Sequence, residues 1–126
     1  MQMKSIDPAS LKKRLDKGDA VLIDVREVHE HAREHIEGAY LAPLSRFHAE
    51  DFAAHREKTA VFYCHSGGRT GSNARLLASK GFRDVYHLSG GILAWKAAGL
   101  PTRSRRDASS EGASGEGSRK RFGWLF

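Results

Sequence analysis

The chain is organised around residues 61–77, which read Val61-Phe62-Tyr63-Cys64-His65-Ser66-Gly67-Gly68-Arg69-Thr70-Gly71-Ser72-Asn73-Ala74-Arg75-Leu76-Leu77. The apolar residues 60–63 predict a strand, the glycine-containing segment after them predicts a loop, and residues 70–80 have the pattern of a helix. A loop between a strand and a helix directs several backbone N–H groups into one concavity, where the helix dipole adds positive potential. We therefore interpret this stretch as an anion-binding loop.

Cys64 is the only cysteine of the chain, and it stands at the start of this loop. A thiol surrounded by N–H donors is expected to have a lowered pKa and to exist largely as the nucleophilic thiolate. Arg69 adds a fixed charge and a planar donor fork suited to an oxyanion. A lone cysteine is more often a small, inert core residue, and Gly67-Gly68 alone would only mark a turn. The arginine and the strand-to-helix transition favour a reactive thiol.

The rest of residues 1–101 alternates between strand and helix patterns. The near-continuous apolar run at 20–25 is typical of a strand buried on both faces of a parallel sheet. A helix is predicted to begin with Asp7 as its N-cap and Pro8 in its first turn, and to end at Gly18. Further helices are predicted at 27–35, 44–55 and 92–98, and further strands at about 40–41 and at 85–88. This alternation predicts an α/β fold with a mainly parallel central sheet flanked by helices.

Asp24 and Arg26 follow the strand at 20–25. Ligands of parallel α/β sheets lie beyond the carboxyl ends of the strands, so both residues are expected on the same side of the sheet as Cys64. A helix cap or a half-buried ion pair explains them better than direct chemistry. In either arrangement, Asp24 and Arg26 could support the cysteine loop.

The length of 126 residues and the hydrophobic content of 40% suit one modest globular domain at 1–101. Residues 102–126, rich in Ser, Gly and charge, predict a flexible basic tail that ends in an aromatic segment. Basic and aromatic residues at 119–126 could contact an anionic membrane surface or a partner, although an unstructured end is the better interpretation. One cysteine cannot form an internal disulfide, and the first residues lack the pattern of a signal peptide, so we expect a cytoplasmic protein.

The formal net charge is +6. Residues 1–101 hold 15 Lys and Arg against 12 Asp and Glu, and residues 102–126 hold six against three, so the short tail carries half of the excess. This distribution has no basic stripe with interleaved aromatic residues, and nucleic-acid binding is not expected. His29, His31 and His35 have no second pair of ligands elsewhere, so we interpret them as a solvated helix face and expect no metal site.

Four separated motifs now stand in order. They are Leu22-Ile23-Asp24-Val25-Arg26-Glu27, His35-Ile36-Glu37-Gly38-Ala39, Cys64-His65-Ser66-Gly67-Gly68-Arg69 and Ser89-Gly90-Gly91-Ile92-Leu93-Ala94-Trp95. Together they resemble a single-domain rhodanese over about residues 5–101. The resemblance implies the three-layer rhodanese fold and sulfur transfer through a cysteine persulfide, with no separate cofactor. It implies a small donor such as thiosulfate and a thiol or cyanide acceptor.

On this resemblance, Cys64 is the nucleophile and the amides of His65, Ser66, Gly67, Gly68 and Arg69 hold the persulfide. Arg69 supplies the anion-binding charge, and the hydroxyls of Ser66 and Thr70 are further donors. A role for His65 in proton movement is no better supported than no role. Family members often have serine where this chain has Thr70, which keeps the hydroxyl. Larger rhodaneses have a second domain that this chain lacks, so efficient use of thiosulfate is in doubt.

Three other functions compete. A cysteine phosphatase resembles Cys-x5-Arg, but only four residues separate Cys64 from Arg69, so the loop is one residue short for phosphate. A sulfur-relay or regulatory binding module would show little turnover of small molecules, although inactive versions usually lack the cysteine. A cysteine protease needs a histidine base held against the thiol and oriented by a third group, and no such pattern is recognisable.

Overall fold

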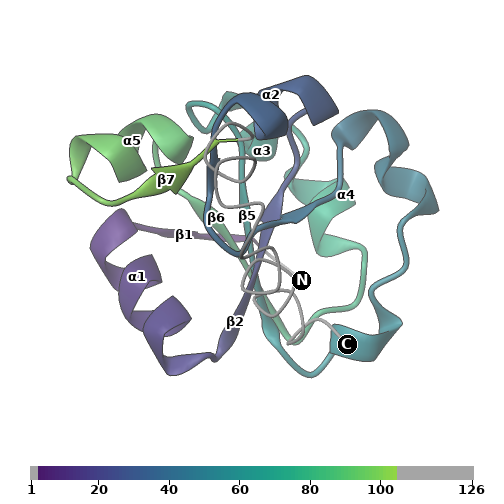
Figure 1. Ribbon diagram of the computed structural model, residues 1–126. Coiled ribbons are helices and arrows are strands. Elements are labelled where there is room, and N and C mark those ends of the chain that lie inside the picture. Colours follow the sequence, from purple (N-terminus) through teal and green to yellow (C-terminus); the bar gives the residue numbers. More distant parts are fainter. Residues whose placement is uncertain (1–2, 105–126) are drawn as a thin grey trace, which may run out of the picture.

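The computed structural model describes residues 3–104, which form an α/β fold (Figure 1). Its main sheet has five parallel strands in the order β1-β6-β5-β2-β4, and β3 and β7 form a separate antiparallel pair. The strands are β1 (Lys4–Ile6), β2 (Ala20–Asp24), β3 (His35–Ile36), β4 (Tyr40–Leu41), β5 (Thr59–Tyr63), β6 (Asp84–Leu88) and β7 (Thr102–Arg103). The helices are α1 (Pro8–Lys17), α2 (Val28–Arg33), α3 (Gly68–Ser72), α4 (Ala74–Ala78) and α5 (Gly91–Ala97), with 3-10 helices η1 (Leu44–Ala49) and η2 (Ala53–His55).

Strands β2 and β5 lie at the centre of the sheet, and all ten of their residues are buried. Successive side chains point to opposite faces, so each strand contributes to two cores. Val21, Ile23 and Phe62 belong to the core under η1, η2 and α4, whereas Leu22 and Val61 belong to the core under α1 and α5. Figure 1 shows α1 and α5 on one side of the sheet and α4 on the other. This double coverage explains the apolar runs in the sequence.

Helix α1 has the predicted ends. The Asp7 side chain accepts a hydrogen bond from the Ser10 N–H at 3.1 Å, and Pro8 is the first helical residue. Gly18 ends the helix in the left-handed conformation, with φ of 73°. Capping groups satisfy the N–H and C=O groups that a helix leaves free at its ends, so these two positions define the helix.

Two predicted helices differ from the structure. Residues 70–80 do not form one helix, because α3 ends at Ser72 and Asn73 has non-helical dihedral angles (φ −114°, ψ 22°) before α4 begins. Residues 44–55 form η1 and η2 instead of an α-helix. Between them, the Asp51 carboxylate accepts a hydrogen bond from the Ala53 N–H at 2.9 Å, a local bond that competes with helix continuation.

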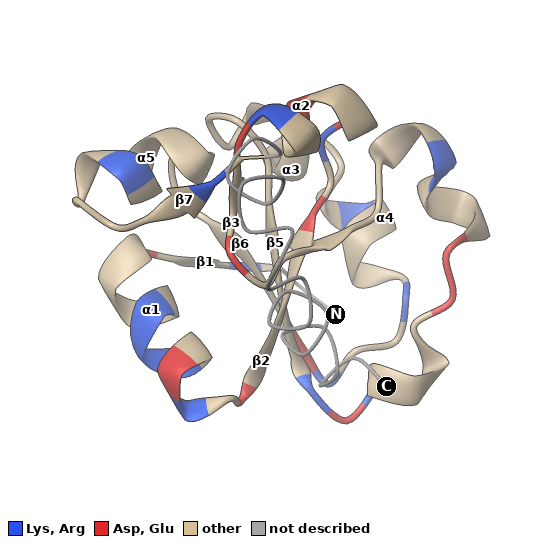
Figure 2. Cartoon of the chain, in the orientation of Figure 1, with Lys and Arg blue, Asp and Glu red and all other residues tan. Residues whose placement is uncertain are grey.

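The helix predicted at 27–35 is shorter, since α2 ends at Arg33 and His35 already lies in β3. Strand β3 pairs with β7, so Thr102 and Arg103, the first two residues of the predicted tail, are paired with the domain. The basic and aromatic segment at 119–126 lies outside the described residues. Among residues 3–104, no helix combines the length and the apolarity needed to cross a membrane. Acidic and basic residues are both spread over the described elements (Figure 2).

Candidate active site

Cys64 follows the last residue of β5, at the carboxyl end of the sheet where α2 and α3 also lie (Figure 1). The loop turns at Gly67, whose φ of 101° lies in the region that glycine alone adopts readily. This turn brings the Gly67 N–H to the Cys64 sulfur, where it donates a hydrogen bond with an N–Sγ distance of 3.1 Å. The thiol therefore lies in a tight loop, and Cys64 is only 1% exposed.

The loop changes the acidity of this thiol. Burial raises the pKa of Cys64, but hydrogen bonds from the N–H and hydroxyl of Thr70 and from the N–H groups of Gly67 and Arg69 outweigh it, so that the pKa lies below its ordinary value. The predicted direction of the shift is confirmed. The Thr70 hydroxyl was among the expected donors, and the Thr70 N–H is an addition, because the expected amides ended at Arg69. Helix α3 has five residues, so nearby N–H groups, not a long helix dipole, produce the effect.

The Thr70 side chain is fully buried beneath the sulfur. Its hydroxyl lies 3.8 Å from the Cys64 Sγ and 2.9 Å from the His87 Nδ1 of β6, and it donates to the Gly67 carbonyl at 3.1 Å. His65 and Ser66 are exposed at the top of the loop. The structure thus brings Thr70 to the sulfur and adds His87, which the sequence did not indicate.

The last motif packs directly on the loop. The N–H groups of Ile92 and Leu93 donate to the carbonyls of Cys64 and His65 at 3.0 and 3.2 Å. Gly91, with φ of 60°, allows this approach, because a Cβ there would lie 2.4 Å from the His65 carbonyl oxygen and 2.5 Å from that of Cys64. Gly91, the first residue of α5, is therefore required by the close approach of the cysteine loop's backbone.

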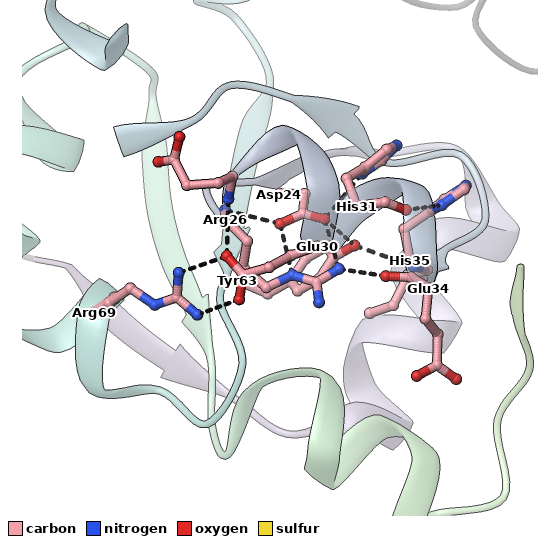
Figure 3. Close-up of polar contacts among 10 residues, drawn as sticks. Asp24, Arg26, Glu30, His31, Glu34, His35, Tyr63 and Arg69 are labelled. Carbon is pink, nitrogen blue, oxygen red and sulfur yellow. Dashed lines mark hydrogen bonds and ion pairs between the residues drawn. The ribbon is translucent and has the colours of Figure 1, made fainter. Parts of the chain in front are cut away.

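Arg69 makes a two-pronged ion pair with Glu30 of α2. Its two terminal nitrogens each lie 2.8 Å from one oxygen of that carboxylate (Figure 3). Hydrogen bonds from Arg69 lower the pKa of Glu30 to about 2, so this carboxylate is charged near neutral pH. The guanidinium expected to bind an anion is thus already held by one carboxylate, although an arginine has five donors and this pair uses two.

Asp24 and Arg26 form a buried ion pair, with side chains 0% and 5% exposed. The Asp24 carboxylate accepts bonds from Arg26 Nε at 3.0 Å and Nη2 at 2.9 Å, and from the Tyr63 hydroxyl at 2.9 Å; His31 Nδ1 lies at the same 2.9 Å (Figure 3). Burial raises the pKa of Asp24, but the bonds with His31 and Arg26 lower it further, so the net shift is downward. The expected ion pair is present, but it is buried and not at the surface or half-buried, and His31 links it to α2.

A pocket of about 220 Å³ opens between α2, the cysteine loop and α5. It is lined by Arg26, Glu30, Arg33, Glu34, His65, Arg69, Ile92, Leu93 and Lys96. Four of these residues are arginine or lysine and two are glutamate, so the pocket favours an anion. A larger cavity of about 410 Å³ is lined by Ala20, the first residue of β2, and by residues of α1 and α5, away from Cys64.

Comparison with known proteins fits this geometry. The family model described as a rhodanese-like domain matches residues 7–98. The chain belongs to the rhodanese-like family. It is 33% identical over 97 residues to the thiosulfate sulfurtransferase GlpE of Coxiella burnetii, a match that covers 77% of this chain and 91% of GlpE.

Two further relatives support the assignment. The uncharacterized protein slr1261 of Synechocystis is 41% identical over 104 residues, and the match covers 82% of this chain but only 58% of slr1261. The solution structure of the rhodanese-like domain of Alr3790 from Anabaena superposes with a TM-score of 0.70 at 32% identity, covering 82% of this chain and 80% of that domain.

In this rhodanese-like domain the histidines of α2 and β3 are not one solvated face. His29 is exposed, but His31 and His35 are partly buried and their rings stack at 4.0 Å between centroids. His31 also bonds Asp24, and the His31 carbonyl lies 2.8 Å from His35 Nδ1. The interpretation as a solvated face was wrong for these two residues. Residues 3–104 contain no group of three or more His, Cys, Asp or Glu side chains that could hold a metal ion.

Proposed function

We propose that this rhodanese-like domain is a sulfurtransferase that carries a sulfane sulfur on Cys64. The observation that supports this most strongly is the Gly67 N–H bond to Sγ, in a loop whose donors lower the pKa of Cys64. A thiolate near neutral pH is the nucleophile that such chemistry requires. The name of GlpE adds thiosulfate as the donor to test first.

In the first half-reaction, the Cys64 thiolate attacks the outer sulfur of thiosulfate. The S–S bond of the donor breaks and its electron pair leaves with sulfite, so that a persulfide anion forms on Cys64 and total charge is conserved. The N–H groups around Sγ are positioned to stabilise the negative charge of the persulfide. In the second half-reaction, cyanide or an acceptor thiolate attacks the outer sulfur and releases the Cys64 thiolate.

Arg69 lines the pocket beside the loop, where it can bind an anion while it stays bonded to Glu30. The guanidinium keeps three N–H donors beyond the two used by Glu30, and Lys96 and the exposed Arg33 line the same pocket. A dianionic donor that enters there meets an excess of positive charge. In this proposal the exposed residues His65 and Ser66 form the rim of the cysteine loop. Asp24 and Arg26 support α2 through the bond between Asp24 and His31.

Formation of thiocyanate from thiosulfate and cyanide tests the proposal. The wild type should turn over, and Cys64→Ser should not. Arg69→Gln should raise KM for thiosulfate several-fold, while Arg75→Gln, the removal of an exposed arginine on α4, is the matched control. Turnover that persists in Cys64→Ser would overturn the proposal, and hydrolysis of an aryl phosphate would point to the phosphatase alternative.

A sulfur relay between proteins is the second candidate, and Leu93 is the observation that favours it. This leucine lines the pocket and is 46% exposed, which suits contact with another protein more than with thiosulfate alone. A persulfide-carrying protein donor should then load Cys64 faster than thiosulfate does. Deletion of residues 119–126 tests the tail, because an unchanged affinity for that donor removes the tail from the account. Either candidate suits a reducing cytoplasm, which we propose as the location.

A further inference from the structure

A line of polar side chains leads from the Cys64 sulfur to the protein surface. Thr70 Oγ1 lies 3.8 Å from Sγ, His87 Nδ1 lies 2.9 Å from Thr70 Oγ1, and Ser5 Oγ lies 3.2 Å from His87 Nε2. The four residues come from the end of β5, from α3, from β6 and from β1, where Ser5 and His87 are register partners. Thr70 is buried, His87 is half-buried and Ser5 is exposed. The line therefore connects a buried thiol with an exposed serine through residues that do not line the pocket.

The Thr70 hydroxyl is the branch point of this line. It has one hydrogen, and three acceptors compete for it: the Gly67 carbonyl at 3.1 Å, His87 Nδ1 at 2.9 Å and Cys64 Sγ at 3.8 Å. If Nδ1 of a neutral imidazole has no proton, it draws the hydroxyl hydrogen toward His87. If Nδ1 carries the proton, it donates to Thr70 Oγ1 and leaves the hydroxyl hydrogen for the sulfur or for Gly67.

We propose that His87 is a positioning residue that controls, through Thr70, whether a hydroxyl hydrogen is available to the Cys64 thiolate. In the thiol state, Cys64 S–H donates to Thr70, Thr70 donates to His87 Nδ1, and His87 Nε2–H donates to Ser5. In the thiolate state, every one of these bonds is reversed. This inference rests on the proposed role of Cys64 as the sulfur-carrying nucleophile.

The change between the two states balances. Cys64 gives its proton to Thr70 Oγ1, the Thr70 hydroxyl proton moves to His87 Nδ1, the Nε2 proton moves to Ser5 Oγ, and Ser5 gives its proton to water or a buffer base. One proton leaves the protein. The imidazole is neutral before and after, and only its tautomer changes. The thiol can thus lose its proton while a donor occupies the pocket.

The surroundings of His87 suit a neutral imidazole. Burial lowers the pKa of His87 below its ordinary value. The ionisable groups on neighbouring elements are engaged elsewhere: Lys4 of β1 lies 3.6 Å from Asp84 of β6, and Arg69 of α3 is paired with Glu30. Cys64 itself, reached through Thr70, is therefore the titrating group to which the imidazole responds.

Ring 15N chemical shifts, which differ between the two tautomers, test the inference on the full chain with 15N-labelled histidine. The signal of His87 among the seven histidines is assigned by its loss in His87→Asn. In the wild type, this signal should pass from the Nε2–H to the Nδ1–H tautomer as the Cys64 thiolate appears at 240 nm. The same tautomer change should be absent in Cys64→Ala and in Thr70→Val. A tautomer that stays constant while Cys64 titrates overturns the inference.

The rate of Cys64 alkylation by iodoacetamide separates this role from a structural one. At pH 7, Thr70→Val should react roughly 3- to 10-fold more slowly, because a hydrogen bond to a charged sulfur is lost, and Thr70→Ser should restore the rate. Thr59→Val removes another buried threonine hydroxyl, at the far end of β5, and is the control for packing. His87→Asn keeps an amide near the Nδ1 position but cannot exchange tautomers. A wild-type pH profile for His87→Asn would reduce His87 to a structural residue.

These measurements need no sulfur donor. If the tautomer changes with the thiolate but thiosulfate never loads Cys64, the coupling stands and the proposed function fails. If Cys64 is loaded but the tautomer does not respond, the function stands and this inference fails.

Discussion

Glu30 and Arg69 lie 39 residues apart in the sequence, yet both oxygens of the one meet both terminal nitrogens of the other at 2.8 Å. The pair ties α2 to the helix that follows the cysteine loop. The neighbouring His31 ties the same α2 to Asp24, which accepts from Tyr63 at the end of β5 (Figure 3). Helix α2 is therefore connected to the cysteine loop by the Glu30–Arg69 ion pair and to the end of β5 by the buried network around Asp24.

Replacement of Glu30 by Gln should alter how stability depends on pH. The pKa of Glu30 is about 2 in the folded chain, below the 4.5 of an exposed glutamate. The pair therefore stabilises the fold above about pH 4.5, and this contribution is lost as the pH falls from 4.5 through 2. Because the Arg69 side chain is 40% exposed, we expect the pair to add less than about 1 kcal/mol to the unfolding free energy at pH 6, and Glu30→Gln to lose this amount.

Urea unfolding of the wild type and Glu30→Gln at pH 6 and pH 3 measures this effect. The difference in unfolding free energy between the two proteins should narrow at pH 3. Glu57→Gln, at an exposed glutamate before β5, is the control and should show no such narrowing. A difference that is the same at both pH values would show that the ion pair does not stabilise the fold.

Asp24→Asn should be severely destabilising. It would leave the Arg26 guanidinium buried without its counter-charge, at a cost of about 3–5 kcal/mol in unfolding free energy. Tyr63→Phe removes a hydroxyl that donates to Asp24 and accepts from the Ile36 N–H, and should cost about 1–3 kcal/mol. Asp16→Asn, at an exposed i,i+4 pair with Lys12, should stay within about 0.5 kcal/mol. Urea midpoints give all three values, and similar losses for Asp24 and Asp16 would contradict the buried network.

Gly91→Ala tests the contact between α5 and the cysteine loop. Gly99 is the matched control, because it also has a positive φ, 79°, but a Cβ there meets nothing within 4 Å. Gly99→Ala should cost about 1–2 kcal/mol from backbone strain alone. Gly91→Ala should cost about 1–3 kcal/mol more, since its Cβ would strike the His65 carbonyl, and it should slow alkylation of Cys64. Equal effects of the two substitutions would show that the contact is not essential.

The sequence predicted the fold where physical signals are local. The apolar runs predicted β2 and β5 because strands buried on both faces have few polar residues. Asp7 and Gly18 defined α1 because caps are local. The break at Asn73 was not predicted, because the Asn73 side-chain amide donates to the Arg69 carbonyl at 2.8 Å, and apolar spacing does not record such a local bond.

The site was predictable only in part, because some of its residues come from segments far from Cys64 in the sequence. Cys64, Asp24 and Arg26 belong to short motifs and Thr70 follows one of them, so these residues could be chosen from the sequence, and their roles in sulfur transfer are proposals. Glu30 and His87 come from other segments, and no spacing rule links them to Cys64. The contact between Ser5 and the half-buried His87 can be seen only once β1 and β6 are aligned.

Intact mass after incubation with thiosulfate tests the central claim, that Cys64 carries the sulfur, most directly. We predict that the wild type gains about 32 Da, the mass of one sulfur atom, that cyanide removes it, and that Cys64→Ala gains nothing. No gain in the wild type, or the same gain in Cys64→Ala, would contradict the account.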